Sequence, residues 1–363
     1  MKKRKIALSV LLILTSIYFM ACSNGSSASE NKEKSTYTVT YTDGVDRLDI
    51  SVPNDTNKYH KGDSVTVKFT DIGNRSEYTF AGWSDGTNTF TSDGTTSFEM
   101  GNTDVTLTAQ WIFNYIGTKA TSESKTVGDI VFKDGSAMPY TVFNSLDASE
   151  KETKKSSAIA LIFYKGTELN SGNDTTTSRI LGVGLKHNKD GLAWCRRDSD
   201  TDYADAWGKE ITTIDCKQSG SIGAYTFTGD KNGSDNLEQM EEFEGIDDTS
   251  TPANYPAFYF GKNYKDVTDS NIKDTPYENG WYLPSYAELF QIYACRADST
   301  NGFDIDAASN ALGGNTFGTS IYWSSSQYAS IGNDAFSFNF TNGFWDYGYK
   351  TTNYFYVCAI RAF

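Results

Sequence analysis

The chain has 363 residues, of which 38% are hydrophobic and 14% aromatic, which is enough for packed cores in two or three domains and excludes a disordered chain. Its 46 acidic residues outnumber its 32 basic ones, giving a formal net charge of −14. Such a field repels phosphate backbones, so we expect no nucleic acid among its partners.

Residues 1–21 have the pattern of an export signal. Basic residues at positions 2–5 precede an apolar run that ends at Met20 and is short and one-sided for a membrane span. The residues Phe19-Met20-Ala21-Cys22 resemble a relaxed bacterial lipobox, which implies cleavage before Cys22 and acylation of this cysteine. An uncleaved anchor helix is the alternative. In the first reading the protein is an exported lipoprotein of the outer membrane or cell surface, held by its N-terminal lipid.

The segment after the signal is a predicted tether, residues 22–36, because its small polar residues cannot seed a core. Export makes disulfides possible among Cys195, Cys216, Cys295 and Cys358, and buried free thiols are the equal alternative. Histidines occur only at positions 60 and 187, and Cys-x-x-Cys spacings are absent. We therefore predict no metal site and no cofactor.

A β-rich module is predicted over residues 37–111. Alternating apolar residues predict strands at 37–41, 48–52, 64–69, 78–83 and 104–111, separated by turn residues. The sequences YTFAGW, FEM and DVTLTAQW resemble the Listeria–Bacteroides repeat of bacterial surface proteins, which implies a small β-grasp-like spacer or adhesion module without catalysis. Trp83 and Trp111 are expected to pack in its core.

A linker at 112–126 leads to a second domain, 127–363, in which strands and helices mix, so that the fold class is α+β. Apolar runs predict strands within 127–138 and 157–166. A helix is predicted within 279–296, where Ser285 and Glu288 form a capping box, and another at 234–243. The acidic stretch 198–205 is interpreted as a solvated loop rather than a calcium site, because it lacks the glycine and final Glu of an EF-hand loop.

Two motifs of this domain resemble fixed points of the C-type lectin fold of the formylglycine-generating-enzyme type. They are GWYLPSYAEL at 280–289 and VCAIRAF at 357–363. With YWSSSQYA at 322–329 and NDAFSFNFTNG at 333–343, their order is similar to that in the variable proteins of diversity-generating retroelements. The lipoprotein signal extends the resemblance to treponemal variable lipoproteins. The resemblance implies a C-type-lectin-like domain with a variable region at 321–363.

Genes of this family are copied with errors at adenines, and the codons randomised in this way cannot encode Lys, Glu, Gln, Met or Trp. Residues 321–363 contain these types only at Trp323, Gln327, Trp345 and Lys350, and acids only at Asp334 and Asp346. Rigid rings among small polar groups suit a receptor surface. The resemblance and this composition predict these ligand-binding positions: Tyr322, Tyr328, Ile331, Asn333, Asp334, Ser337, Asn339, Phe344, Asp346, Tyr347, Tyr349, Asn353, Tyr354 and Phe355.

Other residues of this segment are predicted to be scaffold. Phe336, Phe338 and Phe340 alternate as a half-buried strand does, whereas the rings from 344 to 355 do not alternate strictly and follow an Asn342-Gly343 turn. By the family pattern the scaffold is Trp323, Ala335, Phe336, Phe338, Phe340, Gly343, Val357, Ile360 and Arg361.

The sequence thus predicts a surface-displayed lipoprotein that binds a protein or other macromolecule, and not an enzyme. The related oxidase needs a pair of reactive cysteines near the C-terminus, and only Cys358 lies there, in an apolar strand that predicts a buried, inert thiol. An invariant adhesin or structural surface lipoprotein of the same fold is the alternative.

Overall fold

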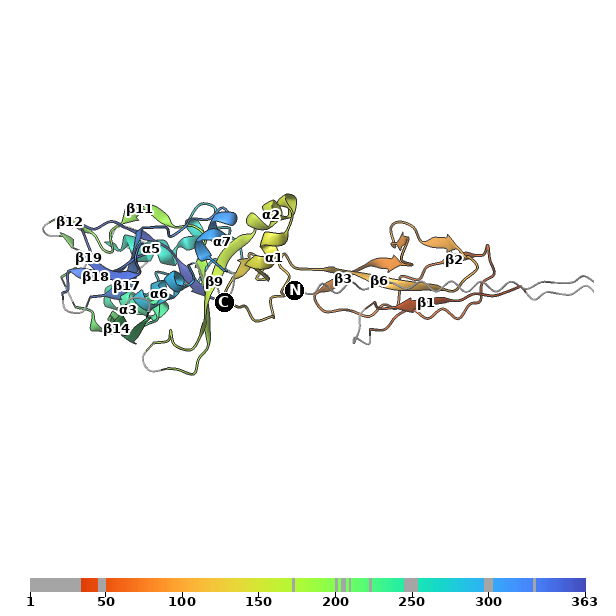
Figure 1. Ribbon diagram of the computed structural model, residues 1–363, viewed down its shortest axis with the longest axis horizontal. Helices are drawn as coiled ribbons and strands as arrows, with labels where there is room; N and C mark the ends of the chain where they lie inside the picture. Colours follow the sequence, from red (N-terminus) through yellow and green to blue (C-terminus); the bar gives the residue numbers. More distant parts are fainter. Residues whose placement is uncertain are drawn as a thin grey trace, which may run out of the picture. The chain divides into compact units, whose positions relative to one another are not determined.

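The computed structural model describes residues 34–44, 50–171, 174–199, 202–203, 207–208, 210–221, 224–244, 254–296, 303–328 and 331–363 (Figure 1). The predicted signal peptide, its lipidation site Cys22 and most of the predicted tether lie outside these residues. The chain divides into two compact units. One contains residues up to Arg75 together with Phe80–Ile112, and the other contains Ser76–Thr79 together with Phe113–Phe363.

The first unit is built from strands. Its four-stranded sheet has the order β1-β6-β3-β4, and a separate pair joins β2 to β5. β1 and β6 are neighbours in this sheet and run parallel, with Val39 beside Val105. The bounds are β1 (Val39–Thr42), β2 (Ser64–Thr66), β3 (Tyr78–Ser84), β4 (Thr89–Phe90), β5 (Ser97–Glu99) and β6 (Val105–Phe113).

The core of the first unit surrounds Trp83, which is fully buried, and Trp111 packs against it half-buried. Each indole N–H is satisfied by a backbone carbonyl, of Lys68 for Trp83 and of Asp43 for Trp111. Both tryptophans therefore serve packing, as expected. The strand expected at 48–52 does not form over residues 50–52, and positions 48 and 49 lie outside the described residues.

The second unit contains a six-stranded sheet of order β16-β21-β10-β9-β7-β8. The last strand of the chain lies between β16 and β10, with Arg361 beside Trp281 and also beside Gly182. The bounds are β7 (Asp129–Phe132), β8 (Ala137–Pro139), β9 (Ala158–Gly166), β10 (Arg179–Gly184), β16 (Trp281–Tyr282) and β21 (Ile360–Ala362). The two motifs GWYLPSYAEL and VCAIRAF are thus joined by backbone hydrogen bonds.

A five-stranded sheet of order β11-β20-β17-β18-β19 carries most of the C-terminal segment. β17 pairs antiparallel with β18 and parallel with β20. The bounds are β11 (Asn188–Leu192), β17 (Ile321–Gln327), β18 (Asp334–Asn339), β19 (Phe344–Tyr349) and β20 (Phe355–Val357). β11 and β19 are the two edges of this sheet.

Helices and two short hairpins complete the second unit. Helix α6 begins at the Ser285–Glu288 capping box, as expected, and α3 covers the second predicted helix. The helices are α1 (Tyr140–Ser145), α2 (Ala148–Lys155), α3 (Gly233–Glu244), α5 (Pro256–Lys262), α6 (Tyr286–Ala294) and α7 (Ile305–Ala311), with 3-10 turns η1 (Thr212–Ile214) and η2 (Tyr264–Asp266). The hairpins are β12 (Arg197–Ser199) with β13 (Asp202–Tyr203), and β14 (Cys216–Ser221) with β15 (Ala224–Gly229).

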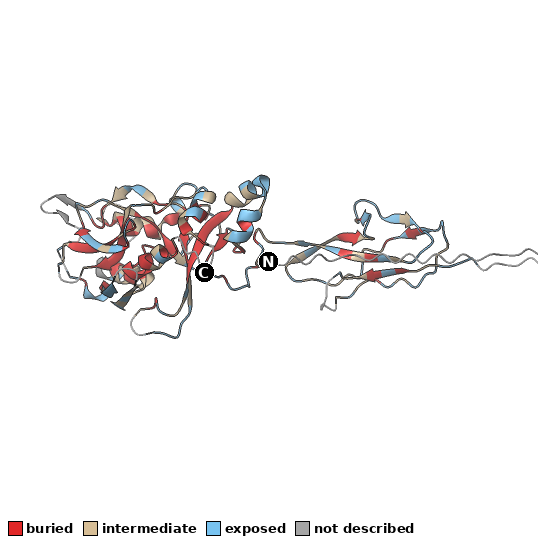
Figure 2. Ribbon diagram, viewed as in Figure 1, coloured by how far each residue is buried: buried red, intermediate tan, exposed pale blue. Residues whose placement is uncertain are grey.

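Buried residues follow the central strands, which are red along most of their length in Figure 2. β18 was expected to be buried on one face, yet it is buried on both, because Phe336 and Phe338 face α6 while Ala335 faces a second cluster around Trp194 and Trp323. The acidic stretch 198–205, expected as a loop, contributes residues to the β12–β13 hairpin. The fold class is mixed α+β, as expected.

Candidate ligand-binding surface

The aromatic C-terminal segment forms a hairpin at one edge of the five-stranded sheet. β18 and β19 pair antiparallel, with Asn339 beside Phe344 at the turn. Within that turn Gly343 has a φ of +72°, a left-handed conformation that favours glycine. A Cβ at Gly343 would also lie only 2.5 Å from the ring of Tyr293. The Asn342-Gly343 sequence thus determines where the chain reverses.

Four large rings of this segment are exposed. The exposed fractions are 41% for Phe344, 46% for Tyr347, 59% for Tyr349 and 65% for Tyr354. Among the side chains that the structure describes, every exposed aromatic one lies between residues 344 and 354. Single exposed apolar residues are common on protein surfaces, but a concentration of rings in one segment marks an interaction site.

Three of the rings on β19 share one face of the sheet. The register sets Trp345, Tyr347 and Tyr349 beside Phe338, Phe336 and Asp334, and alternate residues of a strand point the same way. The ring of Tyr328 stacks on Tyr347 at 5.0 Å between centroids, and Trp345 lies 6.1 Å from Tyr347. We call Tyr328, Trp345, Tyr347 and Tyr349 the ring face.

The ring face is supported directly by the domain core. Phe336 contacts Tyr328 at 5.2 Å on one side and stacks on Tyr286 of α6 at 5.2 Å on the other. Aromatic pairs at such separations add stability beyond the area they bury. Tyr347 therefore stands on a packed layer through its contact with Tyr328, which limits the conformational entropy lost when a partner binds.

The opposite face of the hairpin is filled by Trp323. Its indole N–H donates to the carbonyl of Leu192 at 2.7 Å, and its ring lies 4.6 Å from that of Phe355. Above it β19 carries Gly348, where an added Cβ would come 2.8 Å from Phe355 and 2.9 Å from Trp323. The glycine lets the edge strand approach the buried indole.

The predicted ligand-binding residues divide by exposure. Three of them, Tyr322, Asp334 and Ser337, are buried. A side chain enclosed in the core cannot touch a ligand at the surface, so these three predictions are corrected and the residues leave the set. Of the others, Ile331, Phe344, Asp346, Tyr347, Tyr349 and Tyr354 are exposed, and Tyr328, Asn333, Asn339, Asn353 and Phe355 are half-buried.

The predicted scaffold residues are buried, except Arg361, which is half-buried. The guanidinium of Arg361 lies 4.8 Å from the ring centroid of Tyr277 and 5.5 Å from that of Phe363. Its side chain is therefore held between rings by cation–π contact.

Lys350 is a buried residue to which the sequence assigned no role. It directly follows β19, is fully buried, and has its ammonium 4.7 Å from the ring centroid of Trp194. Its carbonyl accepts from the amides of Trp194 and Cys195. Burial lowers the pKa of Lys350 to about 8, and the pKa of Asp334 is raised by burial against the opposing charge of Lys350. The signal in the sequence was its position as the one Lys of the segment 321–363.

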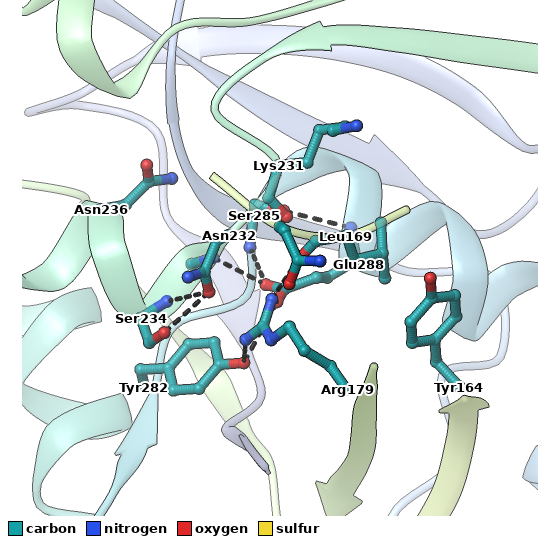
Figure 3. A network of polar contacts seen from close by, with 12 residues as sticks. Tyr164, Leu169, Arg179, Lys231, Asn232, Ser234, Asn236, Tyr282, Ser285 and Glu288 are labelled. Carbon is teal, nitrogen blue, oxygen red and sulfur yellow. Dashed lines mark hydrogen bonds and ion pairs between the residues drawn. The ribbon is translucent and has the colours of Figure 1, made fainter. Parts of the chain in front are cut away.

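A buried polar network holds the N-terminus of α6 (Figure 3). One oxygen of Glu288 accepts from the backbone amides of Ser285 and Gly233, at 2.8 and 3.1 Å. The other lies 3.3 Å from the guanidinium of Arg179 and accepts from the hydroxyl of Tyr282 at 3.1 Å. The carboxylate thus joins α6 to the starts of α3 and β10, and its partners offset the cost of burying a charge.

The described residues contain no group of His, Cys, Asp and Glu side chains arranged to hold a metal ion. Their four cysteines are buried, and no disulfide joins any two of them. Of the two alternatives for these cysteines, disulfides or buried thiols, the structure contains buried thiols. No helix within the described parts of the chain has the length and apolar character needed to cross a membrane.

Comparison with known proteins identifies the first unit. Residues 26–114 match the divergent InlB B-repeat domain, which is the Listeria–Bacteroides repeat inferred from YTFAGW and DVTLTAQW. None of the curated proteins compared shows significant similarity to the chain.

A solved structure, a fimbrial protein from Bacteroides ovatus, aligns with 90% of this chain and 69% of its own, at 14% identity and a TM-score of 0.43. A likeness of this degree establishes neither a shared fold nor a shared function.

Proposed function

We propose that this protein is a surface lipoprotein whose C-terminal domain binds a protein or another macromolecule through the ring face and the neighbouring Phe344 and Tyr354. The concentration of all exposed aromatic side chains of the described residues between 344 and 354 carries this proposal. Rings of this kind are enriched where proteins recognise partners, since they bury much area and lose few torsions.

The domain is proposed to have the C-type-lectin type of fold. What supports this is the pairing of its two resembling motifs, because Tyr282 of GWYLPSYAEL lies beside Ile360 of VCAIRAF in one sheet. The capping box that begins α6 lies within the first motif, and its Glu288 is fully buried. Residues that close a domain in this way are suited to stay constant while exposed positions change.

Diversification by a retroelement is the finer part of the proposal. It is supported by the sparsity in residues 321–363 of the types that randomised codons cannot encode, and by the division of this segment into buried and exposed positions. Four residues of the segment are of types that randomised codons cannot encode. Of these, Trp323, Gln327 and Lys350 are buried, and Trp345 is half-buried. The remaining exposed positions can then vary without disturbing the core.

We propose a binding role without catalysis. Burial raises the pKa of the Cys358 thiol and raises that of Cys216 to about 12, so both stay protonated and poorly nucleophilic near neutral pH. Burial also lowers the pKa of His187 to about 3, and a neutral, enclosed imidazole suits packing rather than proton transfer.

Surface location is proposed from the lipobox-like sequence at Cys22 and from the InlB-type repeat. Replacing Cys22 with Ala should prevent acylation and release or mislocalise the protein, which fractionation of membranes checks. Full retention of Cys22→Ala in the membrane would favour the uncleaved anchor helix.

The test of diversification is to sequence the DNA around the gene. We expect a near-copy of the segment encoding residues 321–363 beside a reverse transcriptase, differing from the gene only where the copy carries adenine. Absence of such a copy from the whole genome would leave the alternative, an invariant adhesin or structural surface lipoprotein. Sibling genes separate the two as well, because diversification confines substitutions to the C-terminal segment, whereas an invariant adhesin scatters them over loops.

A further inference from the structure

β19 is the terminal strand of its sheet, so no strand of the described residues pairs with its outer side. An open edge presents unpaired N–H and C=O groups that readily accept a strand from another chain. Natural proteins protect such edges against pairing, and in β19 side chains of the same chain accept hydrogen bonds from the edge amides.

The register defines which backbone groups point outward. The amide of Lys350 donates to the carbonyl of Asn333 at 2.9 Å, which makes these two residues a hydrogen-bonded pair of the ladder. Such pairs alternate along antiparallel strands with pairs that exchange no bonds. Counting back from Lys350, the N–H and C=O groups of Trp345, Tyr347 and Tyr349 point away from β18.

Two side chains occupy this outward row. The N–H of Tyr347 donates to Oδ1 of Asp346 at 2.9 Å, and the N–H of Tyr349 donates to Oδ1 of Asn353 at 2.9 Å. The carbonyl of Tyr349 accepts from the amides of Thr352 and Asn353, at 3.3 and 3.1 Å. Two of the three outward N–H groups therefore already have partners within the chain.

We propose that Asp346 and Asn353 close the edge of β19 against strand addition by a second copy of this chain. The edge is suited to pair with itself, since a two-fold axis at Tyr347 sets Trp345 of one copy beside Tyr349 of the other. Aromatic pairs of this kind favour strand association. An incoming strand must first displace both side-chain acceptors before it can bond to the N–H groups of Tyr347 and Tyr349.

This inference goes beyond the proposed function, because it concerns the backbone of β19 and holds whatever ligand the rings bind. It also reassigns two predicted ligand contacts. The side chains of Asp346 and Asn353 accept hydrogen bonds from the backbone of β19, and a ligand that bound either side chain would compete with these bonds.

The test compares the full chain with its Asp346→Ala/Asn353→Ala variant. The matched control is Asp190→Ala/Thr352→Ala, which removes one exposed carboxylate from β11 at the opposite edge and one exposed side chain beside Asn353. Light scattering after size exclusion measures mass across a dilution series, and hydrogen exchange measures the amides of Tyr347 and Tyr349.

We expect the original chain and the control to stay monomeric, and the double variant to dimerise as its concentration rises. In dilute solution its two amides should exchange about tenfold faster, as expected for the loss of one hydrogen bond each. Adding Tyr347→Pro removes the central N–H and should restore the monomer. A double variant that stays monomeric overturns the proposal, and so does a dimer that persists with proline at position 347, because rings alone would then hold it.

Discussion

The hydroxyl oxygen of Tyr322 lies 2.8 Å from Nδ1 of His187, and both side chains are buried. The imidazole also packs on the ring of Phe317 at 4.6 Å between centroids. This contact ties the residue before β11 to the start of β17, so a residue that the sequence placed at the ligand surface instead stabilises the interior.

The first prediction concerns acid stability. Because burial lowers the folded-state pKa of His187 to about 3, whereas an unfolded histidine titrates near 6.5, the unfolded chain binds the extra proton between these values. The neutral His187 imidazole therefore makes its full contribution to the free energy of unfolding above pH 6.5. This contribution is lost as the pH falls toward 3, with a slope of at most about 1.4 kcal/mol per pH unit. Urea unfolding of His187→Asn should show a shallower pH slope than the original chain. Tyr322→Phe should keep the original slope, and equal slopes in all three proteins would contradict the assignment.

The second prediction separates exposed rings from buried ones. Changing Tyr347, Tyr349 and Tyr354 together to Ala should abolish binding to the partner and shift the unfolding free energy only slightly, since surface changes usually stay within about 0.5 kcal/mol each. Tyr322→Phe should do the reverse, keeping the binding and costing about 1 kcal/mol for the lost hydrogen bond. Titration calorimetry and thermal unfolding measure the two effects. Unfolding of the triple variant would show that these rings are structural.

The third prediction tests the close approach at Gly348. Gly348→Ala places a methyl group 2.8 Å from the ring of Phe355, so it should destabilise the domain by about 1–3 kcal/mol. Gly101→Ala, in the first unit, controls for the general effect of changing glycine to alanine, because a Cβ there meets no atom within 4 Å. Thermal unfolding of both variants decides the matter, and an unchanged melting temperature for Gly348→Ala would mean that the edge strand shifts freely.

The fourth prediction concerns the carboxylate of Glu288. Glu288→Gln keeps an acceptor for the amides of Ser285 and Gly233 but leaves Arg179 without its charge partner, so we expect a loss of about 3 kcal/mol or more. Glu288→Ala should cost more, since it also removes the helix cap, worth about 1 kcal/mol. A double-mutant cycle with Arg179→Met isolates the ion pair. A cycle without coupling energy would contradict the stabilising role given to the ion pair.

Local patterns were the part of this fold that the sequence could predict. The capping box at Ser285 located α6, and the short sequences YTFAGW, FEM and DVTLTAQW identified the repeat, because each of these signals lies within a few residues. The strand expected at 48–52 failed for the described residues 50–52, since alternation alone does not ensure that a pairing strand is available.

The candidate site was predictable as a segment and not residue by residue. Exposure of Tyr347 and Tyr349 depends on β19 being an edge strand, and burial of Tyr322 and Ser337 depends on β17 and β18 being central ones. Strand order is set by contacts between distant parts of the chain, such as Lys350 with Trp194, which no local pattern reveals. The same edge position makes Asp346 and Asn353 acceptors for their own backbone.

The position of β21 between β16 and β10 has a consequence for how the protein is made. Residues Ile360–Ala362 are synthesised after both of the strands that they join, which lie far upstream in the sequence. A growing chain cannot complete this sheet until those residues leave the ribosome, so the sheet closes only after all of its other strands have been made. A gene copy with a stop codon or a frameshift before the codons for Ile360–Ala362 lacks the strand between β16 and β10, so its six-stranded sheet should not close.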